Sequence, residues 1–344
     1  MDLDEAAPAP RRRFRLPWAI GIGLTIAVAA WTAIWSTARS RILDEVDHRL
    51  GVLAERGIRI ACADRSIGGY PFRMELACNA PGVTLAETGV SGSAGGLRVV
   101  AQVWDPRLIL VEFDGPGVFG EPNRETSAKW RTLRASLRWS ATGVDRVSIA
   151  AEGLDLTTRP TGGAAVHLTA SHAEVHGRPS GEGRDLDLAA SLAAASLTLA
   201  DKRVGPPAAA VSVSARLVEF LPPGPGPALP AFAARGGRID PVKLGFSVGG
   251  IAVEGSGATR LDEAGRLDGM ITLVARGLES LASGGAKDLG PELTAVLSGF
   301  VLLGKASHDP ALPGRRLEMI VDHGLVRIGR LTLGQMAPLF GAAR

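Results

Sequence analysis

The stretch IRIACADRSIGGYPFRMELAC, from Ile58 to Cys78, decides how the folded part of this chain begins. Apolar residues alternate along both of its arms, and a period of two is typical of a half-buried β-strand. Between the arms, Gly68 and Gly69 permit positive φ, and Pro71 directs Tyr70 toward an extended conformation. We therefore predict a β-hairpin whose turn motif comprises Gly68, Gly69, Tyr70, Pro71 and Phe72.

The hairpin contains the two cysteines of the chain, Cys62 and Cys78, each eight residues from Tyr70. A turn centred on Tyr70 sets them opposite each other, and opposed Cβ atoms of a non-hydrogen-bonded strand pair lie near disulfide distance. A bond closing a loop of this size contributes roughly 3 kcal/mol in the chain-entropy model. Two buried free thiols, which are common in cytosolic proteins, are the alternative. The compartment decides between them.

The cellular compartment of the protein is indicated by an uncharged run of 19 residues from Trp18 to Ser36, WAIGIGLTIAVAAWTAIWS. Its length as a helix nearly matches the roughly 30 Å hydrocarbon core of a bilayer. Trp18, Trp31 and Trp35 lie near its ends, where amphipathic rings favour the membrane interface. A cleavable signal peptide would have a shorter apolar run and a small-x-small cleavage site. We therefore predict an uncleaved transmembrane helix over residues 18–36.

Orientation follows from Arg11, Arg12, Arg13 and Arg15, which precede the apolar run. Basic flanks are retained in the cytoplasm, so residues 1–17 are expected to form a cytoplasmic tail. Everything after Ser36 is then outside the inner membrane, which in a Gram-negative cell is the oxidising periplasm. In that compartment we expect Cys62 and Cys78 to be bonded.

Residues 37–57 are predicted to form an amphipathic connector helix. Leu43, Val46, Leu50 and Leu53 share one face at spacings of three and four, and Gly57 is well placed to end the helix. The helix is either a stalk, a connector lying on the membrane, or a helix packed on the sheet that follows. We expect it to pack on the sheet.

Residues 58–344 consist of short alternating segments divided by Gly, Pro and Asp, and the chain has 44 glycines. This pattern indicates antiparallel β meanders. Examples of expected strands are Arg146–Ile149, Leu154–Thr157 and Val211–Val218. The predicted fold class is mainly β (β-rich α+β), a periplasmic domain of one or two curved antiparallel sheets.

Two segments interrupt the β pattern. Gly290 and Pro291 are expected to start a helix with an apolar face of Leu293, Val296, Leu297, Phe300, Val301 and Leu303. Leu278, Leu281 and Ala282 suggest a shorter helix before it, so one or two helices near residues 278–306 should cover the sheet. Leu221–Pro230, LPPGPGPALP, cannot lie inside a sheet. It is expected to be a crossover loop, with a polyproline recognition segment as the alternative.

The chain offers little catalytic chemistry. His172 and His176 could share a strand face with Glu174 between them, but a metal site needs a further ligand that no local signature supplies. We expect exposed strand histidines, and predict no catalytic residues, metal ligands or cofactors. The sequence shows none of the common nucleophile, phosphate-loop or zinc motifs. The formal net charge of +3 does not indicate the strongly basic surface that binds nucleic acid.

The remaining indication of function is the exposed apolar surface that the strands are expected to present. Several strands have small apolar residues on both faces, as in Ala189–Ala195, and a partly exposed apolar sheet face must be covered or bind something apolar. A membrane tether makes lipids or other envelope components the expected ligands, in a role of envelope maintenance. The alternative is a structural or assembly subunit that binds partner proteins through a sheet edge and the loop 221–230. A hydrolase would need convergent His, Asp and Ser side chains in a cleft.

The order of these features resembles that of a known family. An anchor and an amphipathic helix, followed by Cys62…Gly68-Gly69-Tyr70-Pro71-Phe72-Arg73…Cys78, are similar to the bacterial domain-of-unknown-function family 2125. The ending from Asp322 to Leu333-Gly334, which contains His323, is similar to the C-terminal pattern of that family. The resemblance implies an alphaproteobacterial envelope protein rich in β structure, with a more distant likeness to β-groove proteins of the AsmA type. It implies no catalytic residue.

Overall fold

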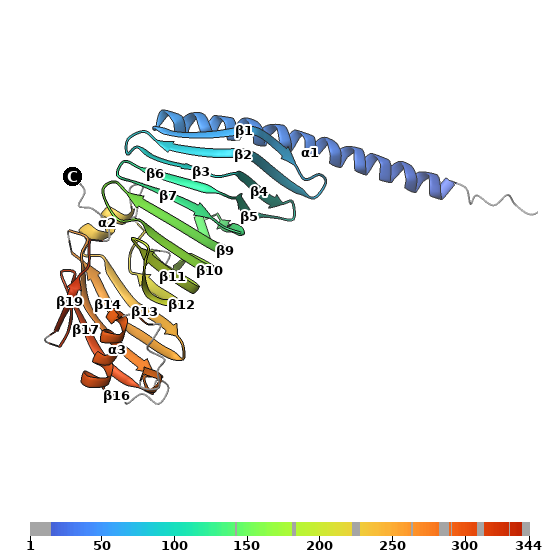
Figure 1. Cartoon of the computed structure of the whole chain (residues 1–344). Coiled ribbons are helices and arrows are strands. Elements are labelled where there is room, and N and C mark those ends of the chain that lie inside the picture. Colours follow the sequence, from blue (N-terminus) through green and yellow to red (C-terminus); the bar gives the residue numbers. More distant parts are fainter. Residues whose placement is uncertain are drawn as a thin grey trace, which may run out of the picture.

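The computed structural model describes residues 15–338 except 142, 181–183, 222–227, 263, 282–288, 290, 308–312 and 330. Within these residues, nineteen strands belong to one antiparallel sheet that starts beside a long N-terminal helix (Figure 1). The predicted mainly β fold class is confirmed, with one sheet rather than two. The predicted basic tail lies outside the described residues up to position 14.

The N-terminal helix α1 (Arg15–Glu55) runs without interruption through the predicted span and the predicted connector. It ends where Gly57 takes a φ of +78° and donates to the carbonyl of Ala54. Its second half lies along strand β1 (Ile58–Gly68). Leu43, Val46, Leu50 and Leu53 are half-buried there. The second half of α1 therefore packs on the sheet, as the spacing of its apolar residues predicts.

Strands β1 and β2 (Arg73–Leu85) form the predicted hairpin, with Ile67 opposite Leu76. Gly69 has a φ of +96°, and a Cβ there would lie 2.7 Å from the carbonyl oxygen of Arg73, so the turn requires glycine at this position. Of the two glycines that permit positive φ, Gly69 alone uses it, and Gly68 keeps a negative φ. Cys62 and Cys78 are joined in a disulfide with their Cα atoms 5.5 Å apart.

After the hairpin the sheet divides into two rows and then reunites. Residues 73–79 of β2 pair with β4, and residues 82–85 pair with β3. The first row continues through β5 and β8, and the second through β6 and β7. Both rows end on the long strand β9 (Gly143–Pro160). The bounds are β3 (Val90–Ser93), β4 (Gly96–Gln102), β5 (Asp105–Asp114), β6 (Gly117–Glu121), β7 (Arg124–Lys129) and β8 (Thr132–Ser140).

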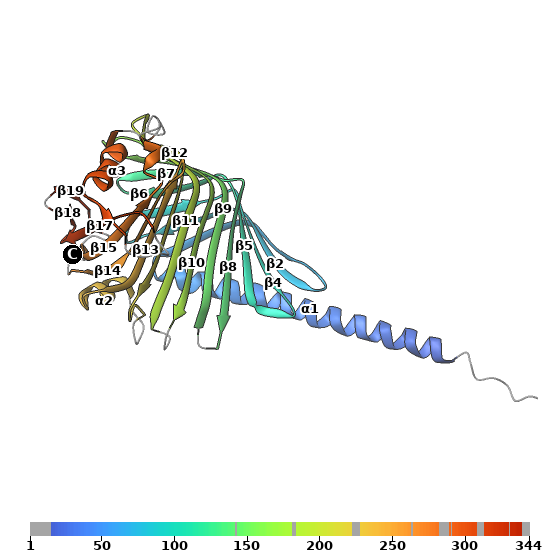
Figure 2. The ribbon, with the colours of Figure 1, turned by 90° about the horizontal axis from the view of Figure 1, so that it is seen from below.

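From β9 onward each strand pairs with the next in sequence, except that β15 pairs with β17, which also pairs with the short strand β16. Figure 2 shows the long strands β8 to β13 side by side, with α1 projecting beyond the sheet. The expected strands 146–149 and 154–157 are both parts of β9, and Val211–Leu217 is the end of a strand that starts at Lys202. The remaining bounds are β10 (Val166–Ser180), β11 (Asp185–Leu199), β12 (Lys202–Leu217), β13 (Arg238–Val248), β14 (Ile251–Leu261), β15 (Leu267–Arg276), β16 (Lys305–Ala306), β17 (Arg315–Asp322), β18 (Leu325–Ile328) and β19 (Leu331–Gln335).

A line of irregular backbone, here called the seam, crosses the sheet from β2 to β11. It comprises Ala80 (φ +45°), Gly95, Gly115, Gly153 (φ +61°) and Ala194 (φ +48°). In β9 the apolar residues have odd numbers before the seam (Val147, Ile149) and even numbers after it (Leu154, Leu156). An irregular residue interrupts the alternation of side chains along a strand. The apolar residues must then shift from odd to even positions to stay on the same face of the sheet.

Two helices cover the C-terminal end of the sheet. α3 (Pro291–Leu303) buries Leu297 and Phe300, each 1% exposed, in a cluster with Ile251, Ala275 and Leu317. This helix was predicted, but Val296, Val301 and Leu303 of its expected apolar face are exposed. α2 (Ala228–Ala234) buries Phe232 against Leu217 and Leu261. The expected loop 221–230 thus ends at Ala228, and its residues 222–227 lie outside the described part.

The shorter helix expected before α3 is described only in part. Leu278 and Leu281 belong to the same cluster as Phe300, whereas Ala282 lies outside the described residues. Residues 278–281 thus add to the cover over the C-terminal end of the sheet.

Candidate functional site

One face of the sheet is apolar from its first strand nearly to its last. Residues directly opposite each other on neighbouring strands share a face. The row through Ile149 and Val175 contains an apolar residue or glycine on each of thirteen strands, and we call the surface that contains it the apolar face. The row is Ile67, Leu76, Val99, Val111, Ala135, Ile149, Val175, Ala190, Val213, Leu244, Gly255, Leu273 and Leu317.

The row displaced by one residue is mostly polar, and it lies on what we call the polar face. Around the middle of the sheet it contains Ser148, His176, Ala189, Ser214 and Lys243. Because successive side chains of a strand point to opposite sides, the two rows belong to opposite faces of a single layer.

Among the described residues, helices α2 and α3 cover the C-terminal end of the apolar face. The clusters under α2 and α3 contain residues of β12, β14, β15 and β17. Between β9 and β12 the apolar side chains are partly exposed: Val175 by 49%, Ile149 by 41% and Val213 by 39%. A cavity of about 710 Å³ lies here, within the size range of ligand pockets. Its lining is Val144, Asp145, Val147, Ile149, Val175, Gly177, Pro179, Leu186, Leu188 and Leu221.

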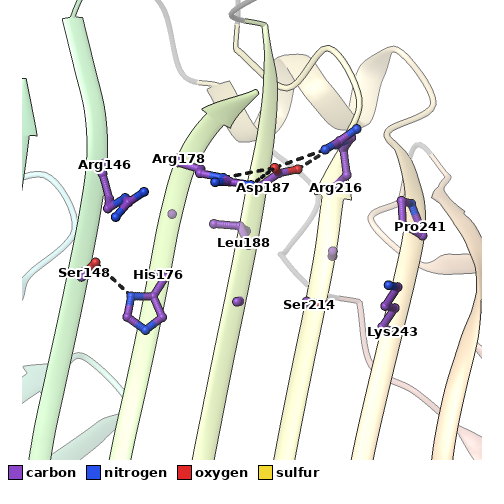
Figure 3. A pocket seen from close by; sticks show the side chains of 13 residues that line it. Arg146, Ser148, His176, Arg178, Asp187, Leu188, Ser214, Arg216, Pro241 and Lys243 are labelled. Carbon is purple, nitrogen blue, oxygen red and sulfur yellow. Dashed lines mark hydrogen bonds and ion pairs between the residues drawn. The ribbon is translucent and has the colours of Figure 1, made fainter. Parts of the chain in front are cut away.

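A second cavity, of about 560 Å³, lies on the polar face over β9 to β13. Figure 3 shows four cationic side chains around it, one each from β9, β10, β12 and β13. They are Arg146, Arg178, Arg216 and Lys243. We call this space the basic cavity.

One carboxylate, Asp187, partly balances these charges. Its Oδ1 accepts from Nε of Arg216 at 2.7 Å, and its Oδ2 accepts from Arg178 at 3.4 Å. The hydrogen bond from Arg216 is the main reason that the pKa of Asp187 lies below its ordinary value. Arg146 and Lys243 have no ion-pair partner among the described residues. The basic cavity can therefore attract a small anion, although its cations are solvated and screened.

The two cavities lie back to back. Gly177 and Leu188 line both of them. The backbone of β10 and β11 separates the two spaces, so a ligand on the apolar face cannot reach the cations of the basic cavity through the sheet. The space on the apolar face is lined mainly by aliphatic side chains, with Asp145 as its one ionisable lining residue among those described.

The histidines of β10 share the polar face, as the sequence indicates. His172 Nδ1 lies 2.6 Å from Glu152 and its Nε2 lies 2.7 Å from Glu174, while His176 lies 3.2 Å from Glu174 and 2.9 Å from Ser148. The hydrogen bond with Glu174 is the largest contribution that raises the pKa of His172. The contacts with Glu152 and Ser148 join β10 to β9, whereas those with Glu174 lie along β10 itself.

A group that the sequence did not suggest brings Asp268, Asp322 and His323 together, with ligand atoms within 4.8 Å of one another. Such a group could coordinate a cation. However, Arg260 pairs with Asp268 at 2.7 Å and Arg327 pairs with Asp322 at 2.7 Å, so arginines already balance both carboxylates. His323 is the main reason that the pKa of Asp322 is lowered. We interpret the group as an ion-pair network.

The predicted turn residues lie away from both cavities, against α1. Tyr70 OH lies 2.8 Å from Thr32 Oγ1, and its ring makes an edge contact with Trp35 at 5.4 Å. Pro71 accepts a hydrogen bond from Trp31 Nε1 at 3.0 Å, and Phe72 is 61% exposed.

Sequence reasoning missed the basic cavity because its residues come from five strands and are distant in sequence. Only register brings them together, and a single sequence does not reveal register over so many strands. The alternation of charged and apolar residues in β10 to β12 was the available signal.

A family model described as uncharacterized protein conserved in bacteria matches residues 35–337, which include the second half of α1 and all nineteen described strands. No curated protein matches the chain. The matched region includes the hairpin with both cysteines and the ending around His323. The chain therefore belongs to the DUF2125 family of bacterial proteins.

Proposed function

We propose that this protein is a membrane-anchored periplasmic protein that binds acyl chains of an envelope lipid on its apolar face. The observation that supports this is the apolar row across thirteen strands, left uncovered between β9 and β12. Kinship with AsmA-type β-groove proteins, expected from the sequence, is part of the same proposal.

The chemistry of the lining favours an acyl chain. Val147, Ile149, Val175, Leu186 and Leu188 are aliphatic, and a row without donors or acceptors cannot orient a polar ligand. Each methylene that leaves water for such a surface contributes about 0.8 kcal/mol. A long flexible chain therefore gains binding free energy along the strands without specific polar contacts.

The proposed location has separate support. α1 is a candidate membrane anchor by length and composition, since the described helix has one apolar window that could cross a bilayer. The disulfide is compatible with an oxidising compartment. A domain held outside the inner membrane would face the lipids that cross the envelope.

The test is direct binding of a labelled lipid to the full chain in detergent micelles. We choose phosphatidylcholine with a fluorescent acyl chain, since its zwitterionic head group is not selected by the basic cavity. Val175→Gln and Val213→Gln place amides on the apolar face, and we expect each to weaken binding several-fold. Ser212→Gln is the matched control, because Ser212 is the neighbour of Val213 on the polar face.

Equal loss in the control and the apolar variants would reject the apolar face as the site. Absence of binding to the wild-type chain, in delipidated form, would reject the function itself. The alternative role, binding of partner proteins through a sheet edge and the loop 221–230, remains a prediction, since residues 222–227 lie outside the described part.

A further inference from the structure

An exposed aromatic cluster lies at the end of the sheet nearest to the apolar part of α1. It consists of Tyr70 and Phe72 from the β1–β2 turn and Val103 and Trp104 from the β4–β5 turn, and we call it the aromatic tip. Trp104 is 67% exposed and Phe72 is 61% exposed, although their rings lie only 6.3 Å apart. Side chains of this size are rarely left in water together without a partner.

The aromatic tip is fixed to α1 by side chains of the predicted span. Trp31 Nε1 donates to the carbonyl of Pro71 at 3.0 Å, and Trp35 Nε1 donates to the carbonyl of Arg73 at 3.4 Å. The backbone N–H of Val103 donates to the carbonyl of Phe72 at 3.1 Å, which holds the second turn against the first. The turns of β1–β2 and β4–β5 therefore have a defined height along the helix (Figure 1).

That height can be compared with the thickness of a bilayer. Ala27, Val28 and Trp31 line an apolar space together with the aromatic tip. From Trp18 to Ala27 the helix rises only about 14 Å, whereas a hydrocarbon core is about 30 Å thick. A bilayer that encloses the uncharged run from Trp18 therefore extends past Ala27 and ends near Ser36.

We infer that the aromatic tip is inserted in the membrane leaflet that α1 leaves, reaching from its interfacial layer into the acyl chains below it. Trp, Tyr and Phe have the chemistry that this layer favours, because their rings are apolar while indole and phenol retain polar atoms. The occupant of the exposed surface is thus lipid, and the sheet has a second membrane contact besides α1. The inference does not depend on the binding of an acyl chain to the apolar face.

Because the disulfide occupies Cys62 and Cys78, the position of the aromatic tip can be tested by labelling a single introduced cysteine. The described residues contain no free cysteine, so an introduced cysteine is the one site for a thiol-reactive nitroxide. The full chain with Trp104→Cys is labelled, reconstituted in phosphatidylcholine vesicles, and measured for accessibility to oxygen and to a water-soluble nickel chelate. Phe119→Cys is the matched control, because Phe119 is an aromatic residue of similar exposure on β6, beyond the seam.

We expect the ratio of oxygen to nickel accessibility to be several-fold higher at position 104 than at position 119. Since removing Trp104 could weaken insertion, Phe72→Cys repeats the measurement with Trp104 intact. Equal ratios at all three positions would show that the aromatic tip lies in water and would overturn the inference. Spin–spin broadening at position 104 would also overturn it, because a second copy of the chain would then occupy the surface.

Discussion

Val175 and His176 are consecutive residues of β10 that line different cavities: Val175 contributes to the aliphatic space of 710 Å³, and His176 to the basic cavity of 560 Å³. One residue of register thus separates two surfaces of opposite chemistry over the same strands. A substitution at either position should report on one surface alone.

Val175→Gln should leave the fold intact. Its side chain is 49% exposed, so replacement removes little buried area, and we expect the free energy of unfolding to change by less than about 1 kcal/mol. Urea denaturation followed by circular dichroism measures this. A loss much above this value would mean that reduced lipid binding by this variant reflects unfolding.

Phe300→Ala should destabilise the C-terminal end of the sheet. Phe300 is 1% exposed under α3, and truncation of a buried phenylalanine costs about 3–5 kcal/mol. Leu302→Ala on the same helix is the control, because Leu302 is 79% exposed and its loss should be within about 0.5 kcal/mol. Similar effects of the two variants in thermal unfolding would contradict the packing of α3.

Cys62 and Cys78 should resist alkylation in the protein isolated without reductant. Mass spectrometry should show no added alkyl group before reduction and two after it. Cys78→Ser should lower the free energy of unfolding by roughly 3 kcal/mol, because the closed loop restricts the unfolded chain. Labelling of the unreduced protein would place it in a reducing compartment.

His172 should have a pKa above its ordinary value of about 6.5, chiefly because of Glu174. The stabilisation from this contact is then complete below that ordinary value and is lost as pH rises through the raised folded pKa. Glu174→Gln should lower the pKa of His172, as measured by hydrogen exchange at the imidazole carbon. Glu125→Gln, on β7, is the control and should leave the pKa of His172 unchanged.

Membrane topology can be tested with reporters. A phosphatase that is active only in the periplasm should function when fused after Arg56 and fail when fused after Pro17, because the arginines before the apolar run hold the N-terminus inside. Activity of both fusions would reject the single span.

Local patterns predicted much of this fold. The alternation in Ile58–Cys78 gave the hairpin, and the spacing of Leu43 to Leu53 gave the helix that packs on β1. Both signals depend on contacts close in sequence. The helix at Pro291–Leu303 was found for the same reason, although the exposure of Val301 and Leu303 depends on how α3 sits on β17.

The long strands were not predicted at their full length. A positive-φ residue such as Gly153 or Ala194 changes the parity of the apolar positions, so β9 and β11 look like two short strands each in the sequence. The two rows between β2 and β9 were missed because a split of this kind is a property of pairing between strands. Distant pairing also explains why the basic cavity was missed.

The uninterrupted helix α1 has a mechanical consequence. It spans about 60 Å, and β1 lies along its second half. The sheet is therefore attached to a continuous helix and not to a flexible linker. On the proposed topology, a flexible linker would let the domain diffuse across the periplasm, whereas the continuous helix keeps the domain at a fixed distance from the bilayer. The lipid ligand proposed for the apolar face would then have to reach the domain close to the bilayer.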